Sequence, residues 1–290
     1  MMCRAKYSAG RQSGLSPGRI RRYFSKRAGF TLIELLVVIS IIALLLALLM
    51  PTLQRVSKQA RAIVCQSNLH QWGLYFSIYT EDNNGRFFFM HQLGGYPRWC
   101  KPMESYYRDE PDIILCPMAM KYIPRDAVSP WWGGGKSSAW CQEERNRYGV
   151  SLGSYGINNW IEDASQSNDP DIELFARWWG SPLVEGANNV PLLLDCMFAG
   201  GSPQERDGPP KDDDVHDPVE GGCSMSHFCI NRHNGSINGL FMDWSVRKVG
   251  LKELWTLKWH RQFDTANEWT RAGGVKPEDW PEWMRNFKDY

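Results

Sequence analysis

Acidic side chains are absent from residues 1–29 of this 290-residue chain, whereas eight Lys or Arg side chains are present there. Without this leader the chain carries 25 basic and 32 acidic side chains, a net charge of −7. A chain with that net charge is a poor ligand for the phosphates of nucleic acids. We therefore expect no nucleic-acid partner.

Charged side chains are also absent from residues 35–50, where Ser40 is the one polar residue. Residues 30–50, taken as a helix that rises about 1.5 Å per residue, match the roughly 30 Å hydrocarbon core of a bilayer. The basic leader places the N-terminal side of this segment in the cytoplasm. A secretory signal would have an apolar core of about 7–15 residues and a small-x-small cleavage site, and this segment has neither.

Glu34 stands at the edge of the apolar segment, where a lone carboxylate costs several kcal/mol in lipid. A plain membrane anchor with an incidental acid explains the length of the segment but not this charge. The run from Gly29 to Ile39, GFTLIELLVVI, resembles the cleavage and methylation motif of type IV prepilins and type II secretion pseudopilins. The resemblance implies cleavage between Gly29 and Phe30 by prepilin peptidase, followed by N-methylation of Phe30. It also implies that Glu34 pairs with the N-terminal amine of a neighbouring subunit, which would neutralise its charge.

Apolar residues continue at helical spacing beyond Pro51, so the sequence predicts one helix from about Thr31 to Tyr79, bent at Pro51. Residues 82–85 favour turn and left-handed conformations and should end this helix. Short apolar runs predict strands, and residues 251–259 predict a short amphipathic helix. The expected strands cover residues 87–90, 112–116, 191–196, 225–231, 237–242 and 246–249.

Together with the resemblance, these elements predict an α+β, pilin-like fold. A long kinked N-terminal helix would pack on a small antiparallel sheet, followed by a loop-rich C-terminal region. The predicted segments are a basic leader at 1–29, a transmembrane or filament-core helix at 30–50, its amphipathic continuation at 51–82, a globular head at 83–263 and a Trp-rich tail at 264–290.

A second resemblance covers most of the head. It rests on Cys65-Gln66-Ser67-Asn68-Leu69, Leu115-Cys116-Pro117, Ser154-Tyr155-Gly156-Ile157-Asn158, and His233 with nine residues before Asp243. These segments resemble a large group of pseudopilin-like proteins with an H-x9-DG signature, and the resemblance implies a Cys65–Cys116 disulfide. Trp244 replaces the Gly of that signature. Because Trp does not adopt a positive φ cheaply, we expect a turn of another type there.

Two groups of side chains are candidate metal ligands. The first group is Cys223, His227, Cys229 and His233; the second is Asp212, Asp213 and Asp214. All residues of the first group have odd numbers, so an extended segment would point their side chains to one side. Their spacing, however, is not that of a standard zinc site. A Cys223–Cys229 disulfide or core packing is the alternative. The second group fits calcium or a solvated acidic loop, and no other cofactor is expected.

The chain is not expected to be an enzyme. His233 and Asp243 would orient each other in a hydrolase, but no Ser or Cys stands in a nucleophile-elbow pattern. The 14 Trp residues either stack on sugars or pack in the core and between subunits. The eight Cys residues, seven without the leader, fit an oxidising compartment with up to three disulfides, or a reducing compartment.

The sequence therefore predicts a structural subunit of a type IV pilus or of a type II secretion pseudopilus. Its partners would be prepilin peptidase, other pilin or pseudopilin subunits, and the inner membrane. The chain would cross that membrane once, with a cytoplasmic leader and a periplasmic or extracellular head. Two alternatives stay open: a membrane-tethered polysaccharide-binding module or minor pilin with a Trp-rich head, and a membrane-tethered hydrolase that uses His233 and Asp243.

Overall fold

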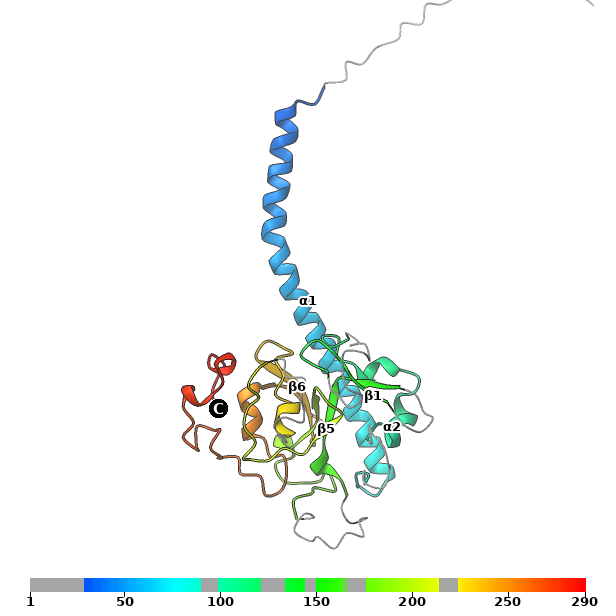
Figure 1. The fold of residues 1–290 in the computed structure, drawn as a ribbon. Coiled ribbons are helices and arrows are strands. Elements are labelled where there is room, and N and C mark those ends of the chain that lie inside the picture. Colours follow the sequence, from blue (N-terminus) through cyan, green and yellow to red (C-terminus); the bar gives the residue numbers. More distant parts are fainter. Residues whose placement is uncertain are drawn as a thin grey trace, which may run out of the picture. The chain divides into compact units, whose positions relative to one another are not determined.

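A computed structural model of the chain gives the fold drawn in Figure 1. It describes residues 29–89, 99–120, 134–143, 150–163, 165, 176–213 and 224–290. The chain divides into two compact units, residues 1–51 and residues 52–290. The predicted leader lies outside the described residues, except for Gly29.

The long N-terminal helix, α1, runs from Leu32 to Asp82 and contains Pro51. Pro51 has no N–H to donate, so one hydrogen bond of the helix is missing, yet helical residues continue on both sides of it. The bend expected at Pro51 stays a prediction. The helix ends as the sequence indicates: Asn84 and Gly85 have φ of +57° and +73°, and the Gly85 N–H donates to Thr80 O at 2.7 Å.

The C-terminal unit is built around a five-stranded sheet in the order β5-β3-β4-β6-β7. Its strands are β3 (Tyr155–Asn158), β4 (Pro191–Asp195), β5 (Gly200–Gly201), β6 (Ser236–Phe241) and β7 (Val246–Gly250). The expected α+β class is confirmed. The sheet is mixed rather than antiparallel, because the short edge strand β5 pairs in parallel with β3. A separate antiparallel pair joins β1 (Trp140–Glu143) to β2 (Val150–Gly153).

The remaining described elements are short helices. They are α2 (Cys100–Tyr107), η2 (Pro111–Ile114), η4 (Asn159–Ile161), η6 (Ala187–Asn189), η7 (Ser224–His227), η8 (Leu251–Thr256), η9 (Pro277–Asp279) and η10 (Glu282–Met284). Two expected strands are thus wrong, because 112–116 and 225–231 include the 3-10 helices η2 and η7. Pro111, at the start of η2, has the fixed φ of a first helical turn. Residues 87–89 form no strand, and residue 90 lies outside the described residues.

The second half of α1 packs on the sheet. Its buried apolar side chains, Cys65, Leu69, Trp72 and Phe76, recur every three or four residues and so lie on one helix face. Gly73 lies on the same side, where an added Cβ would stand 3.0 Å from Leu240 Cδ1 of β6. The helix therefore approaches β6 so closely that a side chain at position 73 would require Leu240 to shift by a few tenths of an ångström.

The Trp-rich tail packs against η8. Trp280 is buried, and its ring lies edge-on to the Trp255 ring with centroids 5.3 Å apart. Lys252 Nζ lies 4.9 Å from the centroid of the Trp280 ring and pairs with Asp289 at 2.7 Å. The last residues of the chain thus contribute to the core of the C-terminal unit.

We expect Trp72→Ala to lower the free energy of unfolding of residues 52–290 by about 3–5 kcal/mol, because it removes a fully buried ring. Trp72 Nε1 also donates to Ile113 O at 3.0 Å, and its ring lies 5.1 Å from that of Trp99. Urea denaturation of segment 52–290, which contains every described buried residue, measures the change. Leu74→Ala, at a position 59% exposed, is the control and should cost under about 0.5 kcal/mol. Equal losses in the two variants would contradict this account of the core.

Candidate functional site

The first half of α1 has no buried face. Every large apolar side chain from Phe30 to Met50 is 45–81% exposed. Among the described residues, α1 is the one helix long and apolar enough to cross a membrane. An apolar surface of this extent is unfavourable in water, so the segment requires lipid or other protein around it.

Thr31 and Glu34 cap the start of this helix. Glu34 Oε2 accepts hydrogen bonds from the Thr31 N–H at 2.8 Å and from the Thr31 hydroxyl at 2.6 Å. The Glu34 N–H donates in return to Thr31 Oγ1 at 3.3 Å. This is a capping box, in which two side chains satisfy N–H groups at the helix start. This role of Glu34 was not predicted from the sequence, although the Thr-x-x-Glu spacing indicates it.

The predicted cleavage point lies just before that cap. Gly29 and Phe30 are outside the helix and exposed, and an added Cβ at Gly29 would meet no atom within 4 Å. The Gly29–Phe30 peptide bond is therefore in irregular, accessible backbone, as a protease substrate must be.

A second candidate site lies inside the C-terminal unit. Its four side chains come from four segments: Cys65 from α1, Cys116 after η2, Asp195 at the end of β4 and His233 before β6. All four are buried, and their ligand atoms lie within 4.8 Å of one another. Among the described residues this is the one such convergence of three or more Cys, His, Asp or Glu ligands.

A buried cation balances the carboxylate of this cluster. Arg232 Nη1 donates to Asp195 Oδ1 at 3.0 Å, and both side chains are fully buried. The guanidinium also donates to the carbonyl oxygens of Ser154, Gly135 and Cys196 at 2.6–3.1 Å. Each Arg232 contact is thus to an oxygen that carries full or partial negative charge.

The cluster shifts the pKa values of its members. Burial raises the pKa of Asp195, but the charges of His233 and Arg232 outweigh burial and lower it to about 2. Burial lowers the pKa of His233, but the Asp195 carboxylate outweighs burial and raises it to about 9. Asp195 therefore holds its negative charge inside the core.

The disulfide expected from the family resemblance stays a prediction. Cys65 and Cys116 are neighbours in the cluster, and the structure holds both as thiols. Burial raises the pKa of the Cys65 thiol well above its ordinary value. Burial also acts to raise the pKa of the Cys116 thiol, but hydrogen bonds with Cys65 and His233 outweigh burial and lower that pKa to about 7.

The structure does not bring the two signature residues together. His233 lies in the buried cluster, whereas Asp243 is exposed in the turn between β6 and β7. There Asp243 Oδ1 accepts from the Ser245 N–H at 3.0 Å and from the Ser245 hydroxyl at 2.5 Å. Asp243 thus shapes a turn, and the orienting pair considered for a hydrolase is not formed.

The structure does not bring the other candidate metal ligands together. His227 Nδ1 lies 3.0 Å from Gly200 O, and Cys229 Sγ lies 4.0 Å from Met284 Sδ. The parity argument fails because residues 224–227 form a 3-10 helix rather than a strand. Asp212 is exposed, and Asp213 pairs with Lys136 at 2.8 Å. Asp214 and Cys223 lie outside the described residues.

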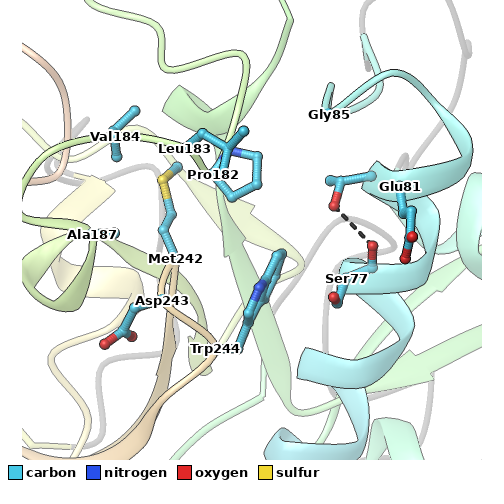
Figure 2. Close-up of a pocket in the computed structure, with 11 residues that line it drawn as sticks. Ser77, Glu81, Gly85, Pro182, Leu183, Val184, Ala187, Met242, Asp243 and Trp244 are labelled. Carbon is cyan, nitrogen blue, oxygen red and sulfur yellow. Dashed lines mark hydrogen bonds between the residues drawn. The ribbon is translucent and has the colours of Figure 1, made fainter.

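The turn between β6 and β7 corrects another expectation. Trp244 has φ of +66°, so it adopts the left-handed conformation that Gly would have in the signature. The Trp244 N–H donates to Phe241 O at 2.9 Å, and this hydrogen bond closes a turn over residues 241–244. Figure 2 shows the Trp244 side chain between Pro182, Leu183 and the C-terminal part of α1. These residues line a pocket of about 620 Å³.

Packing accounts for most of the tryptophans. Nine of the twelve in the described part of the chain are buried, and Trp244, Trp269 and Trp283 are partly buried. A buried ring has no free face on which a sugar could stack. The nine buried rings therefore serve the core rather than a glycan surface.

Comparison with models of known families finds a prokaryotic N-terminal methylation motif at residues 24–50. The match includes Gly29, Phe30 and Glu34, and it supports a pilin-like protein that undergoes prepilin-type processing. The motif and the apolar helix together fit a single-pass, membrane-anchored pilin. Searches of curated proteins and of solved structures find no match.

We expect Arg232→Met to lower the free energy of unfolding of residues 52–290 by about 3–5 kcal/mol, because the Asp195 carboxylate then loses one of its two buried cationic partners. Lys248→Met, at an exposed position on β7, removes the same charge and should cost under about 0.5 kcal/mol. Urea denaturation followed by tryptophan fluorescence compares the two variants. A cost of Arg232→Met no larger than that of Lys248→Met would show that the buried pair does not stabilise the fold.

Proposed function

We propose that this chain is a structural subunit of a type IV pilus or of a type II secretion pseudopilus. Prepilin peptidase would cleave it between Gly29 and Phe30, and the new N-terminal amine would be methylated. The mature chain would stay in the inner membrane, with its head on the periplasmic or extracellular side, until it joins a filament. The methylation motif at residues 24–50 supports this proposal.

One structural observation carries the proposal: the first half of α1 exposes apolar side chains on all its faces. A helix that packs on one soluble domain needs one apolar face only. A helix that is apolar all round suits lipid, and it equally suits a bundle of identical helices. Both environments occur in the life of a pilin-like subunit, first the membrane and then the filament core.

Glu34 gives the assembly step its register in this proposal. In the uncleaved chain its carboxylate caps the helix through Thr31. Cleavage after Gly29 would create a positive amine on Phe30, four residues from Glu34. A Glu34 carboxylate buried among apolar helices is costly unless it meets such a charge on an adjoining copy.

We expect Gly29→Glu to prevent maturation, because a bulky acidic side chain would replace the small residue at the cleavage point. The uncleaved chain retains its 29-residue leader, so it should run about 3 kDa larger than the mature protein. Immunoblotting shows the shift, and N-terminal sequencing of the wild-type product should begin at Phe30. Ser40→Ala, inside the apolar segment, is the matched control and should be cleaved normally. A wild-type product that begins elsewhere would contradict the proposal.

We expect Glu34→Ala and Glu34→Gln to insert in the membrane normally and to reduce filament incorporation at least about tenfold, since either change removes a charge pair worth more than about 1.4 kcal/mol. Gln can still accept the capping hydrogen bonds, whereas Thr31→Val removes the capping hydroxyl and keeps the Glu34 charge. Thr31→Val should therefore assemble. The measurement is the ratio of subunit in the sheared filament fraction to subunit in the membrane fraction.

These three variants separate the two roles of Glu34. Normal assembly of Glu34→Gln together with failure of Thr31→Val would show that the cap matters and the charge does not. Normal assembly of Glu34→Ala would remove Glu34 from the mechanism altogether.

A further inference from the structure

The contacts of His233 Nε2 are unusual for a hydrogen-bonded histidine. This one nitrogen lies 3.0 Å from Asp195 Oδ2 and 3.5 Å from Cys116 Sγ. An imidazole nitrogen carries at most one hydrogen, so it cannot serve both partners fully. In a catalytic Cys-His-Asp arrangement the thiol and the carboxylate contact different ring nitrogens. Convergence of both on one nitrogen is the geometry of ligands around a shared ion.

Two ligand pairs in the cluster have separations that fit a tetrahedral ion. With zinc–sulfur distances of about 2.3 Å and zinc–nitrogen or zinc–oxygen distances of about 2.0–2.2 Å, the corners of the tetrahedron lie about 3.3–3.8 Å apart. Cys116 Sγ is 3.5 Å from His233 Nε2, and Cys65 Sγ is 3.6 and 3.7 Å from the two Asp195 oxygens. The His233–Asp195 contact of 3.0 Å is shorter than a tetrahedral edge, and all four ligand atoms lie within 4.8 Å of one another, so side-chain shifts of up to about 1 Å would complete the site.

The charges balance when a divalent cation is added. Two thiolates and the Asp195 carboxylate contribute −3, Arg232 contributes +1, and the cation contributes +2. With a neutral His233 ring the whole buried group is then uncharged. Because an uncompensated charge in a protein core is costly, this composition favours a divalent ion.

Neighbouring groups already hold the ligands in place. The Asn238 N–H donates to Asp195 Oδ2 at 2.8 Å, and Arg232 donates to the other oxygen. The Tyr155 hydroxyl lies 3.3 Å from Cys65 Sγ. Hydrogen bonds of this kind orient metal ligands and raise the affinity of the site.

We propose that Cys65, Cys116, Asp195 and His233 bind one Zn²⁺ ion as a closed structural site. Two sulfur ligands, one nitrogen and one oxygen suit zinc, whereas calcium and magnesium require oxygen ligands. The four ligands fill a tetrahedron, so no position is left for a substrate. The ion would tie α1 to β4 and to the segments before β6 and after η2, and would thereby stabilise the C-terminal unit.

The proposed ion and the Cys65–Cys116 disulfide exclude each other, because both use the same two sulfur atoms. A disulfide would leave Asp195 and His233 as a buried ion pair beside an uncharged bond. The zinc state uses all four side chains. Measurements of the metal content and of the oxidation state of Cys65 and Cys116 therefore distinguish the zinc site from the disulfide.

The test uses the full-length protein, purified in detergent without an affinity tag that binds metal, from cells grown with zinc. We expect about one zinc per chain by elemental mass spectrometry. The thiols of Cys65 and Cys116, followed by alkylation and peptide mapping, should react only after denaturation with a chelator. Replacement of zinc by Co²⁺ should give the visible absorption of a tetrahedral thiolate site. The cobalt measurement uses wild-type protein, so it does not depend on whether a variant folds.

Variants then assign the ligands. Cys116→Ser and His233→Ala should each lower the zinc content at least about tenfold. Cys229→Ser, which changes a buried cysteine outside the cluster, should keep the zinc. Wild-type protein without stoichiometric metal, whether it yields a Cys65–Cys116 disulfide-linked peptide or Cys65 and Cys116 thiols that react without chelation, would overturn the proposal. Another metal in stoichiometric amount would overturn the assignment to zinc.

Discussion

The buried carboxylate of Asp195 is the group around which the C-terminal unit is assembled. It ends β4, accepts a hydrogen bond from the first half of β6 through the Asn238 N–H, and pairs with Arg232 and His233. Cys65 of α1 lies against the same two oxygens. One side chain thus joins the sheet to the helix that packs on it. Because each contact compensates the cost of burying the charge, none can be removed without affecting the others.

Glu34 and Asp195 show how position decides what a carboxylate does. Glu34 is exposed and caps the start of a helix whose first half buries none of its large apolar side chains. Asp195 is fully buried and has cationic partners from its own chain. The first carboxylate therefore suits a contact between copies, whereas the second stabilises a single copy. The two compact units differ in the same respect. Residues 1–51 include the exposed apolar part of the helix, and residues 52–290 contain the buried core.

The fold was predictable where periodicity extends over many residues. The sequence predicted a helix over residues 31–79, and α1 covers Leu32–Asp82. The apolar runs at 191–196 and 237–242 are strands β4 and β6. Runs of similar length at 112–116 and 225–231, with four apolar residues each, contain 3-10 helices, because so few apolar residues fit either conformation and tertiary packing selects one. Trp244 shows the same selection, since packing holds a residue of low turn propensity at positive φ.

The sequence alone determined the N-terminal site, because its chemistry depends on neighbours in the chain. Gly29, Phe30 and Glu34 lie within six residues, and an apolar run of fixed length follows them. The family resemblance had paired Cys65 with Cys116, but only the tertiary structure decided the buried cluster of residues 65, 116, 195 and 233, which belong to four segments. The parity of nearby residues had grouped His233 with Cys229 and His227 instead. Spacing describes one element at a time, whereas the cluster depends on how a helix, a strand and two loops pack together.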